Sequence, residues 1–311
     1  MDKLPPLGRG IGELLVPTFA AYEDLLKANE ANIRSARRET HGYGPNPRHV
    51  LDVYFPDDVS KTKGKRATVL VFLHGGAFYH GARVNEEYAG GLIFGNLGRF
   101  FTAKYGVTVI VPDYRLISHG AKYPSGGEDV ALVVDWIKTS LAQREGYESV
   151  DVVLLGNSAG GVHVLTFLLD SAFEAEREAA CAEDAAVRLR GLITLGTPFH
   201  WGGFRSEPIQ TYLGENTIEE NSSLNKLQAA IRRGAKLPKV KTLILVSELD
   251  PQIMFTSAEE FKAAWKEADI EIKVLEGHNH ISPPLGLSTG IEREEAWGVQ
   301  VAQFLSSCTS D

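Results

Sequence analysis

A serine in a glycine-rich stretch is the residue of this chain with the clearest potential for chemistry. Residues 156–161 have the sequence G-N-S-A-G-G, with Ser158 at the third position. The apolar run 150–155 before it predicts a buried strand, and the apolar residues 160–169 after it predict a helix. Flanking glycines let a strand and a helix cross closely, with the serine between them in a strained, exposed conformation. The pattern predicts a nucleophilic serine at a strand-to-helix corner.

A serine nucleophile needs a base, and the base needs an acid that orients it. On a sheet with such a corner, the acid and then the histidine follow the serine along the chain, each at the carboxyl end of a later strand. Residues 242–246 predict a strand that leads to Asp250, and residues 270–275 predict one that leads to His280. The order and spacing therefore predict a catalytic triad of Ser158, Asp250 and His280.

For each predicted partner of Ser158, a nearby residue of the same chemical type could take the same role. We favour Asp250 over Glu248 because it lies further beyond the strand and directly before a proline. We favour His280 over His278 because the second histidine of the loop has more reach toward the serine. The His-x-His pattern could also bind a metal, but no carboxylates or cysteines cluster with it. No metal and no cofactor is therefore expected.

An early glycine-rich loop supplies the expected oxyanion hole. Residues 69–73 predict a strand that leads into His74-Gly75-Gly76-Ala77, where small side chains let backbone amides point at one spot. The amides of Gly76 and Ala77 are the predicted donors. Ala159 is the third, because its amide would lie at a helix N-terminus with no partner inside the helix. One such donor typically lowers a barrier by roughly 3 kcal/mol.

The elements that must position these residues follow a regular alternation. Strand-length apolar runs are separated mostly by helix-length amphipathic segments, which predicts a mostly parallel central sheet with helices on both faces. The alternating residues 49–55 predict an additional antiparallel strand at an exposed edge. The predicted parallel strands are 68–73, 107–111, 152–155, 192–195, 242–246 and 270–275, and the predicted helices are 86–104, 127–143, 159–172, 257–267 and 292–305.

Two further segments lie outside this alternation. Residues 12–38 carry apolar residues at helical spacing, so residues 1–47 are expected to form a helical arm ahead of a main domain, 48–311. The connection 197–237 is longer than a crossover requires and includes a predicted helix, 217–233. We predict a cap or lid there, with an ordinary surface excursion as the open alternative. The expected substrate-binding residues are Phe78, Tyr79, Asn157, Phe199, Trp201, Phe204 and Tyr212.

Composition narrows the class of protein. With 311 residues and 43% hydrophobic residues, the chain can bury a sizeable core, and its net charge of -8 disfavours nucleic-acid or anionic-membrane partners. No apolar stretch has the length of a membrane span. Cys181 and Cys308 form no disulfide framework or zinc spacing, so a reducing, cytoplasmic location is expected. The expected partner is a small-molecule ester, and a homodimer is compatible with the sequence.

Together, these motifs resemble the α/β-hydrolase superfamily. Within it, the chain is similar to hormone-sensitive-lipase-like esterases and to kynurenine-formamidase-like hydrolases. The resemblance extends from about Tyr43 to the end and implies an α/β-hydrolase fold with a small cap. The matching residues are His74 to Phe78, Asp113-Tyr114-Arg115-Leu116, Tyr123-Pro124, residues 129–136, Gly156 to Gly161, Asp250-Pro251 and His280, and, for the formamidase-like group, Tyr43-Gly44-Pro45 and residues 51–56.

The chain departs from these families at positions near the expected site. Ala77 stands where many members have a third glycine, which adds a methyl group on the leaving-group side. Asn157 replaces the aspartate or histidine that is common before the nucleophile. The cap matches no known pattern, so substrate choice is expected to reside there.

The function expected from the residues and the resemblance is hydrolysis of a carboxylic ester of a small, apolar or aromatic metabolite. The reaction would pass through an acyl-enzyme on Ser158. The same triad could instead cleave an aryl-formamide, an amide or a lactone. A third possibility, a ligand receptor without turnover, is disfavoured because such a protein is expected to have lost a triad member.

Overall fold

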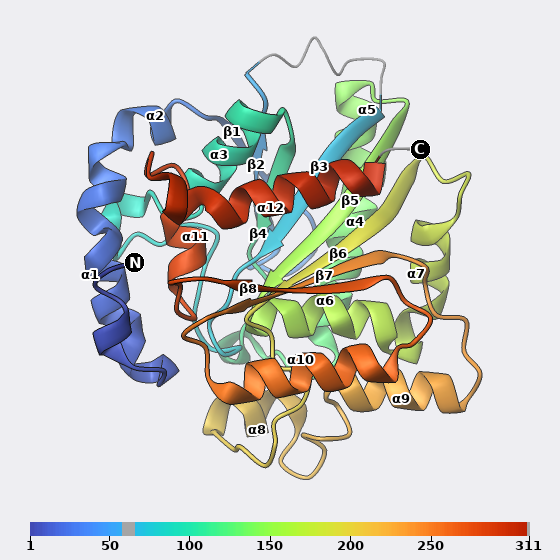
Figure 1. The fold of residues 1–311 in the computed structure, drawn as a ribbon. Helices are drawn as coiled ribbons and strands as arrows, with labels where there is room; N and C mark the ends of the chain where they lie inside the picture. The colour runs from blue at the N-terminus through green and yellow to red at the C-terminus, as the bar shows by residue number, and fades with distance from the viewer. Residues whose placement is uncertain (58–65, 310–311) are drawn as a thin grey trace.

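A computed structural model describes residues 1–57 and 66–309. They form an eight-stranded sheet with the order β1-β2-β4-β3-β5-β6-β7-β8 (Figure 1). The strands are β1 (Arg37–Gly42), β2 (Val50–Phe55), β3 (Arg66–Leu73), β4 (Thr108–Pro112), β5 (Ser149–Asn157), β6 (Val187–Leu195), β7 (Lys241–Ser247) and β8 (Ile270–Leu275). β3 to β8 pair in parallel, whereas β2 is antiparallel to both of its neighbours. The expectation of a mostly parallel sheet is confirmed.

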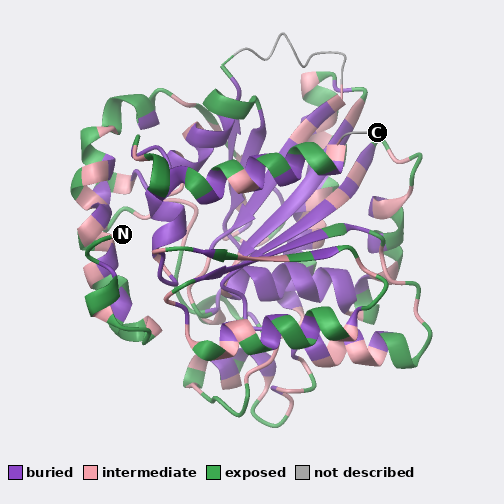
Figure 2. Ribbon diagram, viewed as in Figure 1, coloured by how far each residue is buried: buried purple, intermediate pink, exposed green. Residues whose placement is uncertain are grey.

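Helices cover both faces of the sheet (Figure 1). α3 and α12 pack on one face, and α4, α6 and α10 pack on the other. Because successive strand residues point to opposite faces, Val152 and Leu154 of β5 join one core and Val153 and Leu155 join the other. Figure 2 shows the strands and α6 as the most continuously buried elements. Helices α3 to α7 and α10 to α12 are Gly95–Tyr105, Ser125–Trp136, Ala142–Glu145, Ala159–Leu169, Glu174–Cys181, Gln252–Ala264, Ser282–Gly286 and Glu292–Thr309.

The first part of the chain differs from the sequence prediction. The predicted helix 12–38 is two helices, α1 (Ile11–Ala28) and α2 (Glu30–Arg34), followed by strand β1. β1 consists of polar residues and is largely exposed, so it carried no apolar strand signal. Because β1 pairs with β2, the segment predicted as an exposed edge is an inner strand, and its Leu51 and Val53 are fully buried.

A second correction concerns α3. The predicted helix 86–104 begins only at Gly95, because the preceding loop contains four residues with positive φ, Ala89, Gly90, Gly91 and Phe94. A left-handed residue cannot continue a right-handed helix. The loop folds back and packs Leu92 and Ile93 against the N-terminal helices.

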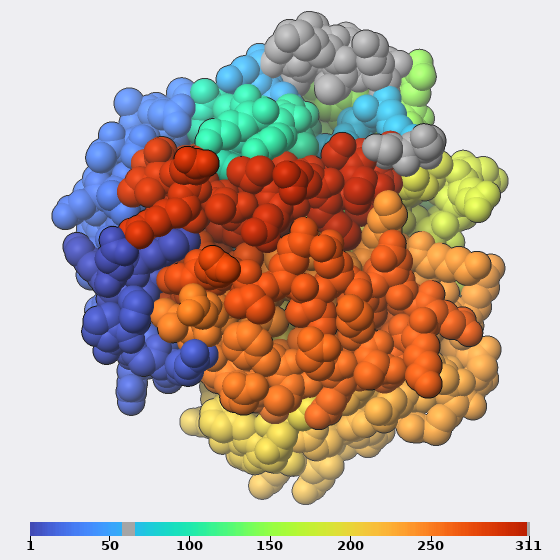
Figure 3. Space-filling model, viewed as in Figure 1, coloured from blue at the N-terminus to red at the C-terminus, as the bar shows by residue number. Residues whose placement is uncertain are grey.

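The N-terminal helices lie along one side of the sheet, beside α11 and one end of α12 (blue in Figure 3). Tyr22 and Leu26 of α1 and Ile33 of α2 are buried there together with Leu285 of α11. The division into an arm, 1–47, and a main domain, 48–311, remains a prediction, and residues 58–65 and 310–311 of that domain lie outside the described residues.

The connection between β6 and β7 contains α8 (Glu207–Leu213) and α9 (Ser223–Arg232). α9 buries Leu227 and Ala230 and lies on the same face as α6 and α10, as a crossover helix does. Residues of α8 pack instead with Phe78, Ala159 and Val162, at the carboxyl edge of the sheet. The connection therefore includes both a covering helix and a segment that reaches the predicted catalytic edge.

Candidate active site

Ser158 lies at the sharp corner between β5 and α6, with φ 51° and ψ -116°. Three glycines make this corner sterically allowed. A Cβ on Gly156 or Gly161 would collide with α6 or with Thr197, and a Cβ on Gly160 would collide with the end of β3. The Ser158 amide donates to the Leu195 carbonyl at 2.8 Å, which fixes the corner to β6. The strained serine is thus held by close packing against α6, the end of β3 and the Thr197 side chain.

The two predicted partners of the serine come together with it in one hydrogen-bonded chain. Ser158 Oγ lies 3.0 Å from His280 Nε2, and His280 Nδ1 lies 2.6 Å from Asp250 Oδ1. The other carboxylate oxygen of Asp250 accepts the Ser247 amide at 2.8 Å. Asp250 and His280 are buried, while Ser158 is partly exposed. A base hydrogen-bonded to both a hydroxyl and an orienting acid is the arrangement that activates a serine.

The competing neighbours take structural positions. Glu248 accepts the Gly277 amide at 2.7 Å and lies at the exposed surface. His278 is buried, and its Nδ1 lies 2.9 Å from the hydroxyl of Ser282. Burial lowers the pKa of His278 to about 4, so this imidazole is neutral near pH 7. Within the part of the chain that the structure describes, neither residue is hydrogen-bonded to the side chain of Ser158, Asp250 or His280.

The His74-Gly75-Gly76-Ala77 loop follows β3 and lies directly against the serine. A Cβ on Gly75 would lie 3.2 Å from Ser158 Cβ. Gly76 and Ala77 have positive φ values of 134° and 51°, which turn the loop sharply. Among the described residues, the amides of Gly76 and Ala77 have no backbone or side-chain acceptor. The loop therefore holds unused donors near the nucleophile, and Ala159 adds the N-terminus of α6.

His74 stabilises this loop through hydrogen bonds and ring stacking. Its Nδ1 donates to the Gly75 carbonyl at 2.7 Å, and its ring stacks on Tyr114 at a centroid distance of 4.4 Å. The Tyr114 hydroxyl donates to the His74 carbonyl at 2.8 Å. Burial lowers the pKa of His74 to about 4. A neutral imidazole can thus remain buried and packed beneath residues 75–77.

The predicted substrate-binding residues divide into buried and exposed groups. Phe199 is fully buried and packs on Phe261 of α10, at a centroid distance of 4.4 Å. Tyr212 is also buried and stacks on Phe78 at 4.3 Å. Trp201 is half-buried beside Phe78, and Tyr79 and Phe204 are exposed.

Asn157 points its side chain between the loop and the sheet. Its Nδ2 donates to the Leu195 carbonyl at 3.1 Å, and its Oδ1 would lie 2.9 Å from a Cβ on Gly75. Asn157 therefore links the serine corner to β6 and lies against Gly75, and its substrate-binding role stays a prediction.

Sequence reasoning missed three residues: Arg9 just before α1, Thr18 of α1 and Asn279 of the loop that carries His280. Arg9 Nη1 donates to the carbonyls of Glu248 and Asp250, at 2.7 and 2.6 Å. Asn279, directly before the catalytic histidine candidate, donates to Thr18 Oγ1 of α1 at 2.8 Å. No local pattern marks Arg9 or Thr18, because their partners are more than two hundred residues away in the chain.

Two features, a metal-binding group of side chains and a membrane-spanning helix, are absent from the described residues, 1–57 and 66–309. No group of three or more histidine, cysteine or acidic side chains is arranged to hold a metal ion. None of the helices there combines the length and the apolar character needed to cross a bilayer.

The fold and the strand-to-helix serine corner define an α/β-hydrolase. The carboxylesterase EstE1, cloned from a metagenomic library, has the same fold, with a TM-score of 0.65 and 15% sequence identity over 94% of this chain and 96% of its own. The family model BD-FAE matches residues 51–264, and the chain therefore belongs to the BD-FAE family.

Two curated relatives match parts of the chain. Esterase LipC of Mycobacterium tuberculosis is 32% identical over 119 residues, which are 38% of this chain and 26% of LipC. The gibberellin receptor GID1 of rice (Oryza sativa subsp. japonica) is 27% identical over 201 residues, 58% of this chain and 51% of the receptor. The chain spans about a quarter of the length of the first curated esterases that it matches. The resemblance to hormone-sensitive-lipase-like carboxylesterases is confirmed.

Proposed function

We propose that this protein is a serine hydrolase that cleaves a carboxylic ester of a small metabolite. The observation that carries the proposal is the continuous hydrogen-bonded chain from Ser158 through His280 to Asp250, with lengths of 3.0 and 2.6 Å. The names of relatives such as LipC and EstE1 support ester hydrolysis as the reaction class. The preserved triad argues against a receptor without turnover, which the similarity to GID1 would otherwise suggest.

In the proposed reaction, His280 Nε2 takes the proton of Ser158 as the hydroxyl attacks the ester carbonyl. The negative charge on the former carbonyl oxygen is stabilised by the amides of Gly76, Ala77 and Ala159. His280 then gives the proton to the leaving alcohol, and the acyl group stays on Ser158. Water, activated by the same imidazole, releases the acid. Asp250 keeps the proton on Nδ1 and stabilises the imidazolium.

Substrate choice is proposed to depend on the aromatic residues around the serine. Phe78 follows the oxyanion loop and stacks on Tyr212, while Trp201 packs against its edge. Tyr79 and Phe204 add exposed rings. Aromatic side chains of this kind bind apolar or aromatic groups. An apolar or aromatic acyl or alcohol group is therefore the favoured substrate feature.

The test combines labelling with turnover. The protein is treated with a fluorophosphonate probe, and its activity is measured on p-nitrophenyl butanoate. We expect one adduct on Ser158, and we expect Ser158→Ala to lose both the adduct and turnover. Ser118→Ala, which removes an exposed hydroxyl, is the matched control and should keep both. An unlabelled Ser158, or unchanged turnover by Ser158→Ala, would refute the proposal.

The alternative substrates use the same triad and differ in the bond cleaved. Comparing kcat/KM on N-formyl aromatic amides, lactones and esters of matched size separates them. If a formamide is turned over faster than the matched ester, the proposed function becomes aryl-formamide hydrolysis. This is the alternative suggested by the resemblance of residues 43–56 to formamidase-like hydrolases. Labelling of Ser158 without turnover of any of these compounds would favour the receptor alternative.

A further inference from the structure

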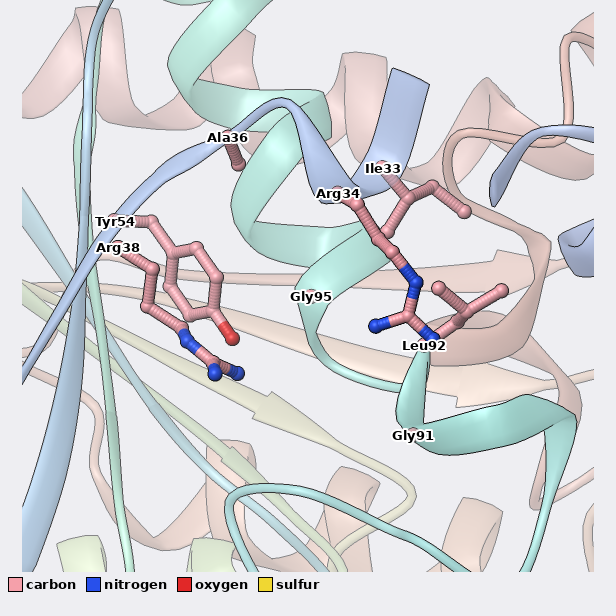
Figure 4. A pocket seen from close by; sticks show the side chains of 8 residues that line it. All are labelled: Ile33, Arg34, Ala36, Arg38, Tyr54, Gly91, Leu92 and Gly95. Carbon is pink, nitrogen blue, oxygen red and sulfur yellow. The ribbon is translucent and has the colours of Figure 1, made fainter. Parts of the chain in front are cut away.

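A cavity of about 250 Å³ lies between α2, β1, β2, the loop before α3 and the start of α3 (Figure 4). None of its lining residues belongs to the triad or to the oxyanion loop. Its volume is below the roughly 300–1,000 Å³ of pockets for drug-sized ligands, so it suits a smaller molecule. Its walls include Ile33, Arg34, Arg38, Tyr54, Leu92 and Gly95.

Tyr54 provides a buried donor that the protein leaves unused. The residue is 2% exposed, and no acceptor for its hydroxyl proton lies among the described residues, while Arg38 and Asp52 are its charged neighbours. Burial raises its pKa to about 12, so the hydroxyl keeps its proton. Its ring packs flat on Gly98, where a Cβ would collide with it. Buried hydroxyls are rarely without a partner, so this fixed donor indicates a missing acceptor.

Two arginines approach the same space from different elements. Figure 4 shows Arg38 beside the Tyr54 hydroxyl and Arg34 on the other side of the cavity. Gly95, the first residue of α3, lies between them, and a Cβ on it would be 3.8 Å from the Tyr54 oxygen. The N-terminus of this eleven-residue helix adds a partial positive charge. Donors and positive charge therefore line the same cavity.

Acidic side chains approach both arginines, and Arg34 Nη2 also donates to the Gly90 carbonyl at 2.8 Å, so each guanidinium keeps only part of its donors for a ligand. Arg38 Nη1 lies 3.8 Å from Asp52 Oδ2, which is beyond hydrogen-bond distance. Asp52 Oδ1 instead accepts from Thr40 at 2.5 Å and lies 3.3 Å from Arg83. Glu30 binds Arg34 through Nε at 2.6 Å.

We propose that this cavity binds a small organic carboxylate. Its two oxygens would accept hydrogen bonds from Tyr54 and Arg38, with Arg34 adding charge, because guanidinium and hydroxyl groups match a planar carboxylate. Its apolar part lies against Ile33 and Leu92, which favours an organic acid over inorganic phosphate. This site is independent of the function proposed for Ser158.

The test is calorimetric titration of the Ser158→Ala protein with butanoate, benzoate and butanamide. We expect saturable binding of at least one carboxylate, and binding of the neutral amide at least about tenfold weaker. Tyr54→Phe and Arg38→Gln should each weaken carboxylate binding by about tenfold. Arg232→Gln, an exposed arginine of α9, is the matched control and should bind as the parent does.

Thermal melting checks that each variant is folded. Tyr54→Phe removes only an oxygen without a partner, so its melting temperature should stay within a degree or two of the parent. The proposal is overturned by carboxylate binding that both variants leave intact, by equal binding of the amide, or by no saturable binding of either carboxylate. It is also overturned if inorganic phosphate alone binds in a Tyr54-dependent way, because the apolar wall would then have no role.

Discussion

The carboxylate of Asp250 has a hydrogen-bond partner at each of its two oxygens. One carboxylate oxygen faces His280, the other accepts the Ser247 amide, and the backbone carbonyl accepts Arg9. The carboxyl is therefore fixed in position as well as paired. A substitution of Asp250 by asparagine can therefore test the charge separately from the position. The asparagine amide can keep the position of the carboxyl, but it carries no negative charge.

We predict that Asp250→Asn lowers kcat about 10³- to 10⁴-fold on any ester that the enzyme turns over, because the wrong tautomer of His280 is then favoured. KM should change much less. The measurement is steady-state kinetics beside a thermal melt. Glu248→Gln keeps an acceptor for the Gly277 amide and serves as the control, with kcat close to that of the parent. A comparable loss in both variants would argue against Asp250 as the orienting acid.

The grouping of Ser158, Asp250 and His280 could be predicted from sequence because each of these residues follows a strand whose apolar pattern is clear; their catalytic roles stay a proposal. Choosing Asp250 over Glu248 rested on its place after the strand, and the hydrogen bonds agree with that choice. The burial of Phe199 was not predictable, since an aromatic residue in a connection looks the same whether it faces α10 or a pocket.

At the scale of elements, the helices before β1 contact the two loops that carry the acid and the histidine. Thr18 of α1 is fully buried and accepts from Asn279, whose Oδ1 in turn accepts the amides of Ile281 and Ser282. The turn that holds His280 is thus tied to α1 through one side chain. Such contacts depend on tertiary packing, which explains why no sequence pattern marked them.

We predict that Thr18→Val lowers the free energy of unfolding by about 1–3 kcal/mol, because the buried Asn279 amide loses its acceptor. The variant has nearly the same shape, so packing is conserved. Urea denaturation measures the change. Thr139→Val, at an exposed threonine, is the control and should lie within about 0.5 kcal/mol of the parent. Equal stability of Thr18→Val and the parent would show that α1 contributes no polar support to this turn.

Strand prediction succeeded where both faces are buried and failed at β1. β3 to β8 contain continuous apolar runs because helices cover both sides, apart from the partly exposed β8. β1 has the sequence R-R-E-T-H-G, since an edge strand with charged side chains is protected from pairing with other chains. The alternating residues of β2 were interpreted as an exposed edge strand. This interpretation was wrong because β1, which was not predicted, pairs with β2 and forms the edge instead.

For the whole molecule, buried neutral histidines couple stability to pH. Burial lowers the pKa of His74 and His278 to about 4 and that of His163 to about 3. In the unfolded chain each imidazole titrates near 6.5. Between these values the unfolded state binds more protons, so the stabilisation is fully present above pH 6.5 and is lost as the pH falls toward 4.

We therefore predict that lowering the pH from 7 to 5 reduces the free energy of unfolding by about 2 kcal/mol for each of the three histidines. His278→Gln should reduce this loss by about 2 kcal/mol, whatever its stability at pH 7. Urea denaturation at both pH values measures it. His119→Gln, an exposed histidine, is the control and should show the full loss. A His278→Gln protein with an unchanged pH dependence would contradict the prediction.

The connection between β6 and β7 has a consequence for engineering this molecule. α9 seals one face of the sheet, whereas the exposed residues near Phe204 precede α8 and contribute little to either core. Mutations at the exposed positions near Phe204 can therefore accumulate without the stability penalty that changes in α9 or the serine corner would cause. Libraries confined to residues 204–206 should therefore retain a high fraction of folded members, while libraries in 156–161 should retain almost none.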